Sequence, residues 1–140
     1  MTEVKVSKAI QVPASKVWAK LSTFAGIENY SPIARSVTVG QGAGATRTCY
    51  MPDDAEIHET LNVLDNDGMH LQYAITEGPF PITGYVSDVH VKSLDDSSCE
   101  VTWGATYDVA DENKAAMDEL FSGFYNIIIE SLENVIKSEN

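Results

Sequence analysis

Two charged residues, Arg47 and Glu59, are placed by the sequence where they could do chemistry. Residues 55–64 alternate apolar and polar side chains, as a β-strand with one buried face does. Glu59 shares the spacing of the apolar members, which are Ala55, Ile57, Leu61 and Val63. A carboxylate on a buried face is costly unless it is hydrogen-bonded, paired with a cation or open to a wet cavity. Glu59 is therefore predicted either to meet a ligand in a pocket or to form a salt bridge in the core.

The turn before this strand provides Arg47 as the partner of Glu59. If residues 52–54 form a three-residue loop, Met51 pairs with Ala55, and Arg47 then lies opposite Glu59 on the neighbouring strand. Directly opposed charges stabilise a sheet by only about 0.2–1 kcal/mol. Stability alone is thus a weak reason to bury the pair, so Arg47 and Glu59 are the candidate catalytic residues.

Aromatic side chains occupy many of the other inward positions. Tyrosine hydroxyls need hydrogen-bond partners when buried, and such rings commonly line pockets. For any single ring, packing in the core is the alternative interpretation. The candidate ligand-binding residues are Tyr30, Met51, Tyr73, Phe80, Tyr85, Trp103, Met117, Phe121 and Phe124.

The histidines argue against metal and cofactor chemistry at this stage. His58, His70 and His90 all have the spacing of the polar, solvent-facing side of their strands. We find no histidine, cysteine and aspartate spacing typical of a metal site, and no glycine-rich loop that opens a helix after a strand. A nucleophile elbow, Gly-x-Ser-x-Gly, does not occur either. The sequence therefore predicts no metal, no cofactor, and no serine or cysteine hydrolase chemistry.

The elements that must position these residues follow from hydrophobic spacing. Residues 4–12 predict a first strand, Pro13 opens a helix, and residues 26–32 form a second short helix and a turn. Six further strands are expected at 36–40, 45–51, 55–64, 69–77, 84–94 and 98–109. A long helix runs from Asp111, as its N-cap, to about residue 137, with a buried face of Leu120, Phe121, Phe124, Ile128, Leu132 and Val135. Helices on one face of an antiparallel sheet make an α+β fold.

Two of the expected turns should meet at one end of the sheet. Hairpins in a meander alternate ends, and the turns at 52–54 and 78–81 are separated by one hairpin. Phe80 lies between two prolines, so it is a natural apolar plug for a pocket mouth there. The turn between these two, Asn66-Asp67-Gly68, fits a three-residue loop with glycine in the left-handed conformation.

Composition limits the partners. The chain has 140 residues, 44% of them hydrophobic, and a net charge of -12, so we expect one ligand-binding domain over residues 1–140. The negative charge argues against nucleic acid and anionic membranes. No signal peptide or transmembrane run is evident, which predicts a cytoplasmic protein, as a monomer or weak homodimer. Cys49 and Cys99 should be free thiols, because three strands separate theirs.

The order of several short motifs resembles the polyketide cyclase/dehydratase type of the START/Bet v 1-like superfamily. The motifs are VPASKVW at 12–18, NYSP at 29–32, GATRT at 44–48, ETL at 59–61, GPFP at 78–81 and VTW at 101–103. The resemblance implies a helix-grip fold: a curved sheet of about seven strands around a long C-terminal helix, with an internal cavity. Lachrymatory factor synthases look similar, and their pocket arginine and glutamate would fall on Arg47 and Glu59.

Two functions remain open on this sequence, because fold does not fix function. The first is binding of a small apolar or aromatic ligand, with an acidic or carbonyl group directed at Arg47. The alternative is a cofactor-independent cyclase, dehydratase or isomerase, in which Glu59 moves a proton and Arg47 stabilises developing negative charge. A third hypothesis, a protein-interaction module that uses the outer face of the sheet, would be favoured by a core without a cavity.

Overall fold

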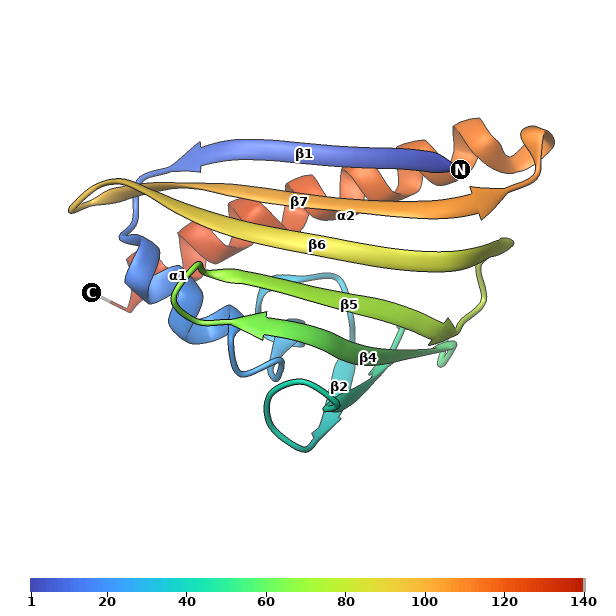
Figure 1. Cartoon of the computed structure of the whole chain (residues 1–140), viewed down its shortest axis with the longest axis horizontal. Helices are drawn as coiled ribbons and strands as arrows, with labels where there is room; N and C mark the ends of the chain where they lie inside the picture. Colours follow the sequence, from blue (N-terminus) through green and yellow to red (C-terminus); the bar gives the residue numbers. More distant parts are fainter. Residues whose placement is uncertain (140) are drawn as a thin grey trace.

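The computed structural model describes residues 1–139 and shows an antiparallel sheet with a long C-terminal helix across its concave side (Figure 1). The elements, in chain order, are β1 (Thr2–Ile10), α1 (Ala14–Leu21), the 3₁₀ helix η1 (Ile27–Tyr30), β2 (Arg35–Val39), β3 (Thr46–Tyr50), β4 (Glu56–Asp65), β5 (His70–Glu77), β6 (Ile82–Asp95), β7 (Ser98–Val109) and α2 (Asp111–Ser138). Each predicted element is present, with ends that differ by a few residues.

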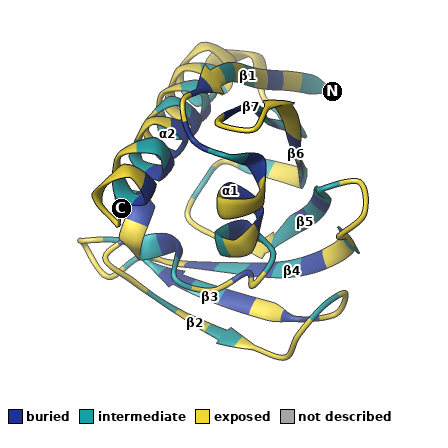
Figure 2. Cartoon of the chain, turned by 90° about the vertical axis from the view of Figure 1, so that its left-hand side faces the viewer, coloured by how far each residue is buried: buried dark blue, intermediate teal, exposed yellow. Residues whose placement is uncertain are grey.

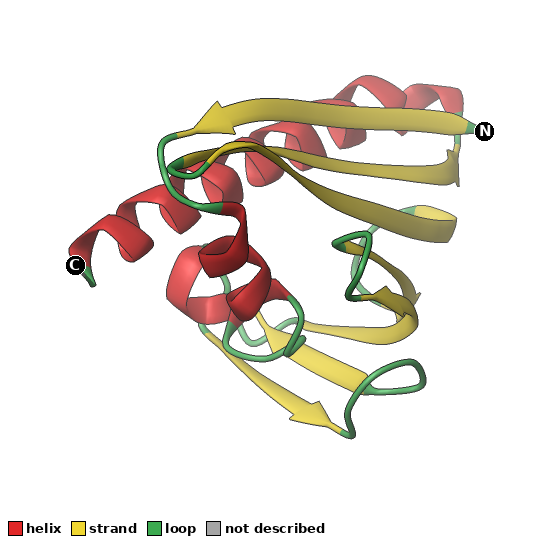
Figure 3. Ribbon diagram, turned by 60° about the vertical axis from the view of Figure 1, so that its left-hand side comes forward, coloured by secondary structure: helices red, strands yellow, loops and turns green. Residues whose placement is uncertain are grey.

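The seven strands lie in the order β1-β7-β6-β5-β4-β3-β2, and every neighbouring pair is antiparallel. The sheet is strongly curved, α1 lies at one end of its strands, and α2 closes its open side (Figures 1 and 2). α2 packs against β1, β7 and η1, and α1 packs against β6, β7 and α2 (Figure 3). This is the predicted α+β helix-grip fold.

The buried face of α2 differs from the prediction. Of the six residues expected there, Leu120 is 44% exposed, and Phe124 and Val135 are only half-buried. Apolar side chains occur on two sides of this helix, so their spacing did not decide which side faces the sheet. The buried positions recur with the helical period, and they are Phe121, Tyr125, Ile128, Ile129, Leu132 and Ile136.

The start of α2 also differs. Ala110 occupies the N-cap position and no side chain caps the helix, so the prediction of Asp111 as N-cap was wrong by one residue. Asp111 and Glu112 instead lie in the first turn, where their charges stabilise the helix dipole. α1 begins similarly, with Pro13 at the N-cap and its carbonyl accepting from the amides of Lys16 and Val17.

The turn between β4 and β5 is longer than predicted. Asp65 pairs with His70, which makes a four-residue loop in which Met69, not Gly68, takes the left-handed conformation (φ 50°). A register shift between Leu61 and Val63 compensates for the extra residue, so Glu59 pairs with Ile75, the partner that the predicted three-residue loop requires. The shift turns Val63 outward, to 38% exposure, where the unbroken alternation had predicted it inside.

Two further expectations are confirmed. Cys49 and Cys99 are free, and β6, β5 and β4 separate their strands. The turns at 52–54 and 78–81 lie at one end of the sheet, where Pro52, Asp53, Pro79 and Phe80 line a common hollow. None of the helices in residues 1–139 is long and apolar enough to span a membrane.

Candidate functional site

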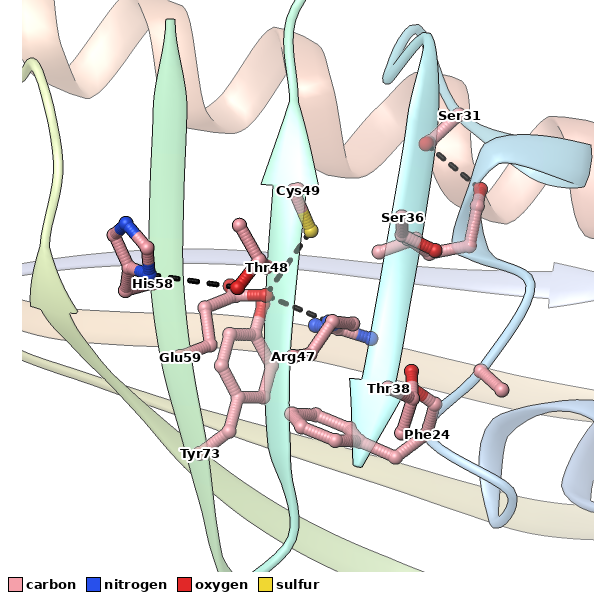
Figure 4. Close-up of polar contacts among 12 residues, drawn as sticks. Phe24, Ser31, Ser36, Thr38, Arg47, Thr48, Cys49, His58, Glu59 and Tyr73 are labelled. Carbon is pink, nitrogen blue, oxygen red and sulfur yellow. Dashed lines mark hydrogen bonds and ion pairs between the residues drawn. The ribbon is translucent and has the colours of Figure 1, made fainter. Parts of the chain in front are cut away.

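Arg47 and Glu59 form a buried ion pair on the inner face of the sheet. They are directly paired residues of β3 and β4, and Arg47 Nε donates to Glu59 Oε1 at 2.6 Å (Figure 4). Only 4% of Arg47 and 7% of Glu59 is exposed. The Cys49 thiol donates to the same carboxylate oxygen at 3.4 Å. The predicted cross-strand contact is thus confirmed.

Two aromatic rings hold the guanidinium of Arg47. Its Cζ lies 3.9 Å from the ring centre of Phe24 and 5.2 Å from that of Tyr73. Phe24 has a left-handed backbone (φ 58°), which is rare for a bulky residue, and Thr38 Oγ1 donates to its carbonyl at 2.9 Å. Phe24 was not among the candidate site residues, because it follows the end of α1 at Leu21 and only its left-handed backbone brings its ring to Arg47.

The environment strengthens the charge on Arg47. Burial by itself lowers the pKa of a guanidinium, but the charge and hydrogen bond of Glu59, with smaller contributions from Cys49 and Tyr73, together outweigh it, so the pKa of Arg47 is raised. Burial, followed by the charge of Glu59, raises the pKa of the Cys49 thiol, which therefore stays protonated. Within residues 1–139, Arg47 Nη2 is buried without a hydrogen-bond partner. The guanidinium of Arg47 is therefore held by Glu59 through Nε, and its Nη2 remains available as a hydrogen-bond donor.

A small pocket of about 70 Å³ lies between the sheet and α2 next to this pair. Glu59 lines the pocket, whereas Arg47 lies outside its lining. The predicted ligand-binding residues that line it are Met51, Tyr73, Phe80, Tyr85, Phe121 and Phe124. The sequence did not single out the remaining lining residues, which are Ile27, Ile33, Cys49, Ile57, Ile75, Leu120 and Tyr125.

Three predicted ligand-binding residues do not reach the pocket. Tyr30 is buried in η1, where burial, partly offset by the charge of Arg47, raises its pKa to about 12. Trp103 lies behind Tyr73 and donates from Nε1 to the Tyr73 hydroxyl at 3.2 Å. Met117 is half-buried and packs against the core. Strand alternation correctly identified the inner face of Trp103, but it carries no information on depth along the strand, and it does not apply to Tyr30 and Met117, which lie in helices.

The hydroxyl groups of Tyr85 and Tyr125 hydrogen-bond each other at the pocket wall. Burial, followed by the charge of neighbouring Tyr73, raises the pKa of both well above 10.0. The pKa of Tyr73 is raised as well, first by burial and second by the charge of Glu59. These three side chains must therefore be neutral in the folded protein.

Alkaline unfolding is the expected consequence. A pKa that is raised on folding contributes stability that is complete below the unfolded-state value and is lost as pH rises above it. Stability should therefore hold up to about pH 10.0, the ordinary tyrosine value, and fall above it. Tyrosinate absorbance and circular dichroism, followed together, should change in one transition. Tyrosinate signal from all six tyrosines at pH 10 in a protein with native circular dichroism would contradict this.

Comparison with known proteins identifies the family. A family model described as polyketide cyclase / dehydrase and lipid transport matches residues 1–137. The chain belongs to this family. No curated protein matches the sequence significantly, so the polyketide cyclase/dehydrase assignment rests on the family model.

Solved structures agree with the helix-grip fold of this family. Protein XoxI from Bacillus cereus is 25% identical, with a TM-score of 0.89 over 100% of this chain and 99% of that one. A protein from Thermobifida fusca is 25% identical, with a TM-score of 0.85 over 95% and 91% of the two chains. Norcoclaurine synthase from Thalictrum flavum, solved with dopamine and hydroxybenzaldehyde, is 16% identical, with a TM-score of 0.79 over 99% and 88%. At that identity the last likeness concerns the fold alone.

Proposed function

We propose that the protein binds a small aromatic molecule carrying a hydroxyl group, in the pocket between the sheet and α2. The observation that carries this proposal is the position of Glu59, a buried carboxylate on the wall of an otherwise largely apolar pocket. Among residues 1–139 it is the only charged residue of the lining. Sites of this composition take apolar ligands and orient them through a few polar groups. A carboxylate accepts hydrogen bonds, so the complementary ligand group is a donor.

The charge balance favours a neutral ligand. Arg47 already neutralises Glu59 through the 2.6 Å contact, and it lies outside the pocket lining. An anionic ligand would therefore meet the carboxylate first and leave a net negative charge in a desolvated site, which is strongly unfavourable. This differs from the expectation of an acidic or carbonyl group directed at Arg47. A hydroxyl group avoids the penalty and gains a charge-assisted hydrogen bond.

Binding must open the pocket. A space of about 70 Å³ holds only a few water molecules, whereas sites for organic ligands measure about 300–1,000 Å³. Phe80 is the side chain placed to move, because it lines the inner pocket, the hollow at the 52–54 turn and a third hollow of about 300 Å³ beside the ends of β5 and β6. Its ring contacts Phe121 edge to face, with the centres 5.3 Å apart. We assign it the role of a lid.

Replacing Phe80 with alanine should therefore speed both association and dissociation of an aromatic probe. We expect both rate constants for 2-naphthol to rise about tenfold or more, which corresponds to a barrier lowered by about 1.4 kcal/mol or more. Stopped-flow fluorescence measures both. Leu94→Ala removes an exposed apolar residue far from the pocket lining and serves as control. Rates unchanged from wild type in Phe80→Ala would refute the lid role.

Native mass spectrometry of the protein as purified is the experiment that tests the binding function without assuming a ligand. We expect a retained neutral organic molecule, lost on denaturation and reduced in the Arg47→Met, Glu59→Gln double variant. A preparation free of ligand that also fails to take up small aromatic alcohols would count against a binding protein.

The same geometry supports a second candidate, a proton-transfer enzyme. Glu59 is held on the pocket wall by two donors, Arg47 Nε and Cys49 Sγ, on one oxygen, which orients a carboxylate for general base catalysis. Glu59 would take a proton from carbon next to a substrate carbonyl and return it after rearrangement. Deuterium uptake by 2-tetralone in D₂O, followed by NMR, tests this. Wild type should exceed the double variant, and equal rates would leave binding as the function.

A further inference from the structure

Three potential metal ligands meet on the outer face of the sheet, on the side away from the pocket. His70 of β5 pairs directly with His90 of β6, and Asp88 precedes His90 by two residues on the same face. One ligand atom from each of the three residues lies within 4.8 Å of the others. His70 Nε2 is 2.8 Å from Asp88 Oδ1. The spacing of these residues along the sequence did not predict the cluster, because its members come from two different strands.

The distances are close to those that a metal ion requires. Zinc binds imidazole nitrogen and carboxylate oxygen at about 2.0–2.2 Å, which places two ligand atoms of a tetrahedral site roughly 3.3–3.5 Å apart. His70 Nε2 and Asp88 Oδ1 would have to separate by only about half an ångström from 2.8 Å to admit the ion. The two imidazole rings are stacked, with centres 4.1 Å apart and planes 7° from parallel. Parallel rings do not direct their nitrogen lone pairs at one point, so binding of one ion by both requires at least one of the two rings to rotate out of the stack.

We propose that His70, Asp88 and His90 bind a divalent transition-metal ion on the outer face of the sheet. Two imidazoles and one carboxylate favour zinc, nickel or copper over magnesium and calcium, which prefer all-oxygen sites. Gln72 Nε2 donates to Asp88 Oδ1 at 3.2 Å and so orients the carboxylate. Such hydrogen bonds to a ligand support metal affinity.

The site keeps a coordination position for a further ligand. Asp88 and His90 also line a hollow of about 210 Å³, together with Gly104, the residue paired with Asp88. Three protein ligands with a free position are typical of metal sites that bind water or a substrate group. The net charge of -12 attracts cations to the protein, whereas Lys5, on the same hollow, opposes them locally. Lys5→Ala should therefore strengthen metal binding.

Calorimetric titration of tag-free protein with Zn²⁺ tests the site. We expect one ion per chain, with affinity reduced at least tenfold in His70→Ala and in His90→Ala. His58→Ala is the matched control, because His58 is also partly exposed on the outer face and has a carboxylate nearby, Glu56 Oε1, at 3.2 Å. It should bind zinc as wild type does. His70→Gln provides a second variant if His70→Ala is poorly folded by circular dichroism.

NMR of the histidine rings gives an independent readout, since the chain has three histidines. Zinc should shift the ring nitrogen signals of His70 and His90 and leave those of His58 in place, and Mg²⁺ at the same concentration should shift none. Failure to bind Zn²⁺, or equal loss of binding in His58→Ala and His70→Ala, would overturn the proposal. Because the probe is the metal alone, this result is independent of whether the inner pocket binds a ligand.

Discussion

Replacing Arg47 with methionine should lower the free energy of unfolding by about 3–5 kcal/mol, because it leaves the buried Glu59 carboxylate without its cation. Glu59 is 7% exposed, and its remaining donor is the Cys49 thiol at 3.4 Å, a weak hydrogen-bond donor. Methionine preserves much of the packing against Phe24 and Tyr73, so the loss reports mainly the uncompensated charge. Urea unfolding followed by circular dichroism measures it.

The double variant separates pairing from packing. Adding Glu59→Gln to Arg47→Met removes both charges, so we expect it to recover a large part of the stability lost in the single variant. Arg35→Met is a matched control. Arg35 also stacks on an aromatic ring, with Cζ 3.6 Å from the centre of Tyr50, but it is exposed, and its loss should cost only about 0.5–1 kcal/mol. Single-variant effects that simply add in the double variant would show that the two charges do not interact.

Ligand selectivity is the second large expected effect. Wild-type protein should bind neutral 2-naphthol more tightly than 2-naphthoate, since the pocket wall presents Glu59 and not Arg47. Hydrogen bonds to a charged group contribute about 1.5–3 kcal/mol, against about 0.5–1.5 kcal/mol for neutral pairs. The double variant retains only a neutral amide at residue 59. The preference for 2-naphthol over 2-naphthoate should therefore fall by at least tenfold, about 1.4 kcal/mol.

2-Methylnaphthalene controls for apolar burial in this experiment, because its methyl group replaces the hydroxyl at nearly constant volume. Its affinity should change little between wild type and the double variant, as measured by fluorescence titration. Tighter binding of 2-naphthoate than of 2-naphthol by wild type would contradict the account and would place the ligand group on Arg47 instead.

The strand pattern and one turn were sufficient to predict the buried pair. Alternation along β4 assigned Glu59 to the inner face, and the three residues between Met51 and Ala55 fixed Arg47 opposite it. The prediction for the next turn was wrong, yet the pairing of Glu59 with Ile75 held because a bulge absorbed the additional residue. Local strand spacing is therefore more robust than loop length, since a bulge can correct register within a strand.

Other parts of the site depend on tertiary packing that the sequence pattern does not encode. The face that α2 turns to the pocket could not be decided among consecutive apolar residues, so Tyr125 was missed although it is 1% exposed. The His70, Asp88 and His90 cluster also escaped notice, because its members come from two strands that pair across a hairpin. The alternation of side chains along each strand correctly predicted that the histidines lie on the outer face, but it gave no information on their cross-strand neighbours.

A crystal structure of the protein with 2-naphthol would show directly whether the ligand hydroxyl meets Glu59 in the inner pocket. We expect one molecule between the sheet and α2, with its oxygen within about 2.5–3.0 Å of a Glu59 carboxylate oxygen and the Phe80 ring displaced from Phe121. A ligand bound only on the outer surface, or an inner pocket that stays closed at saturating concentration, would contradict it.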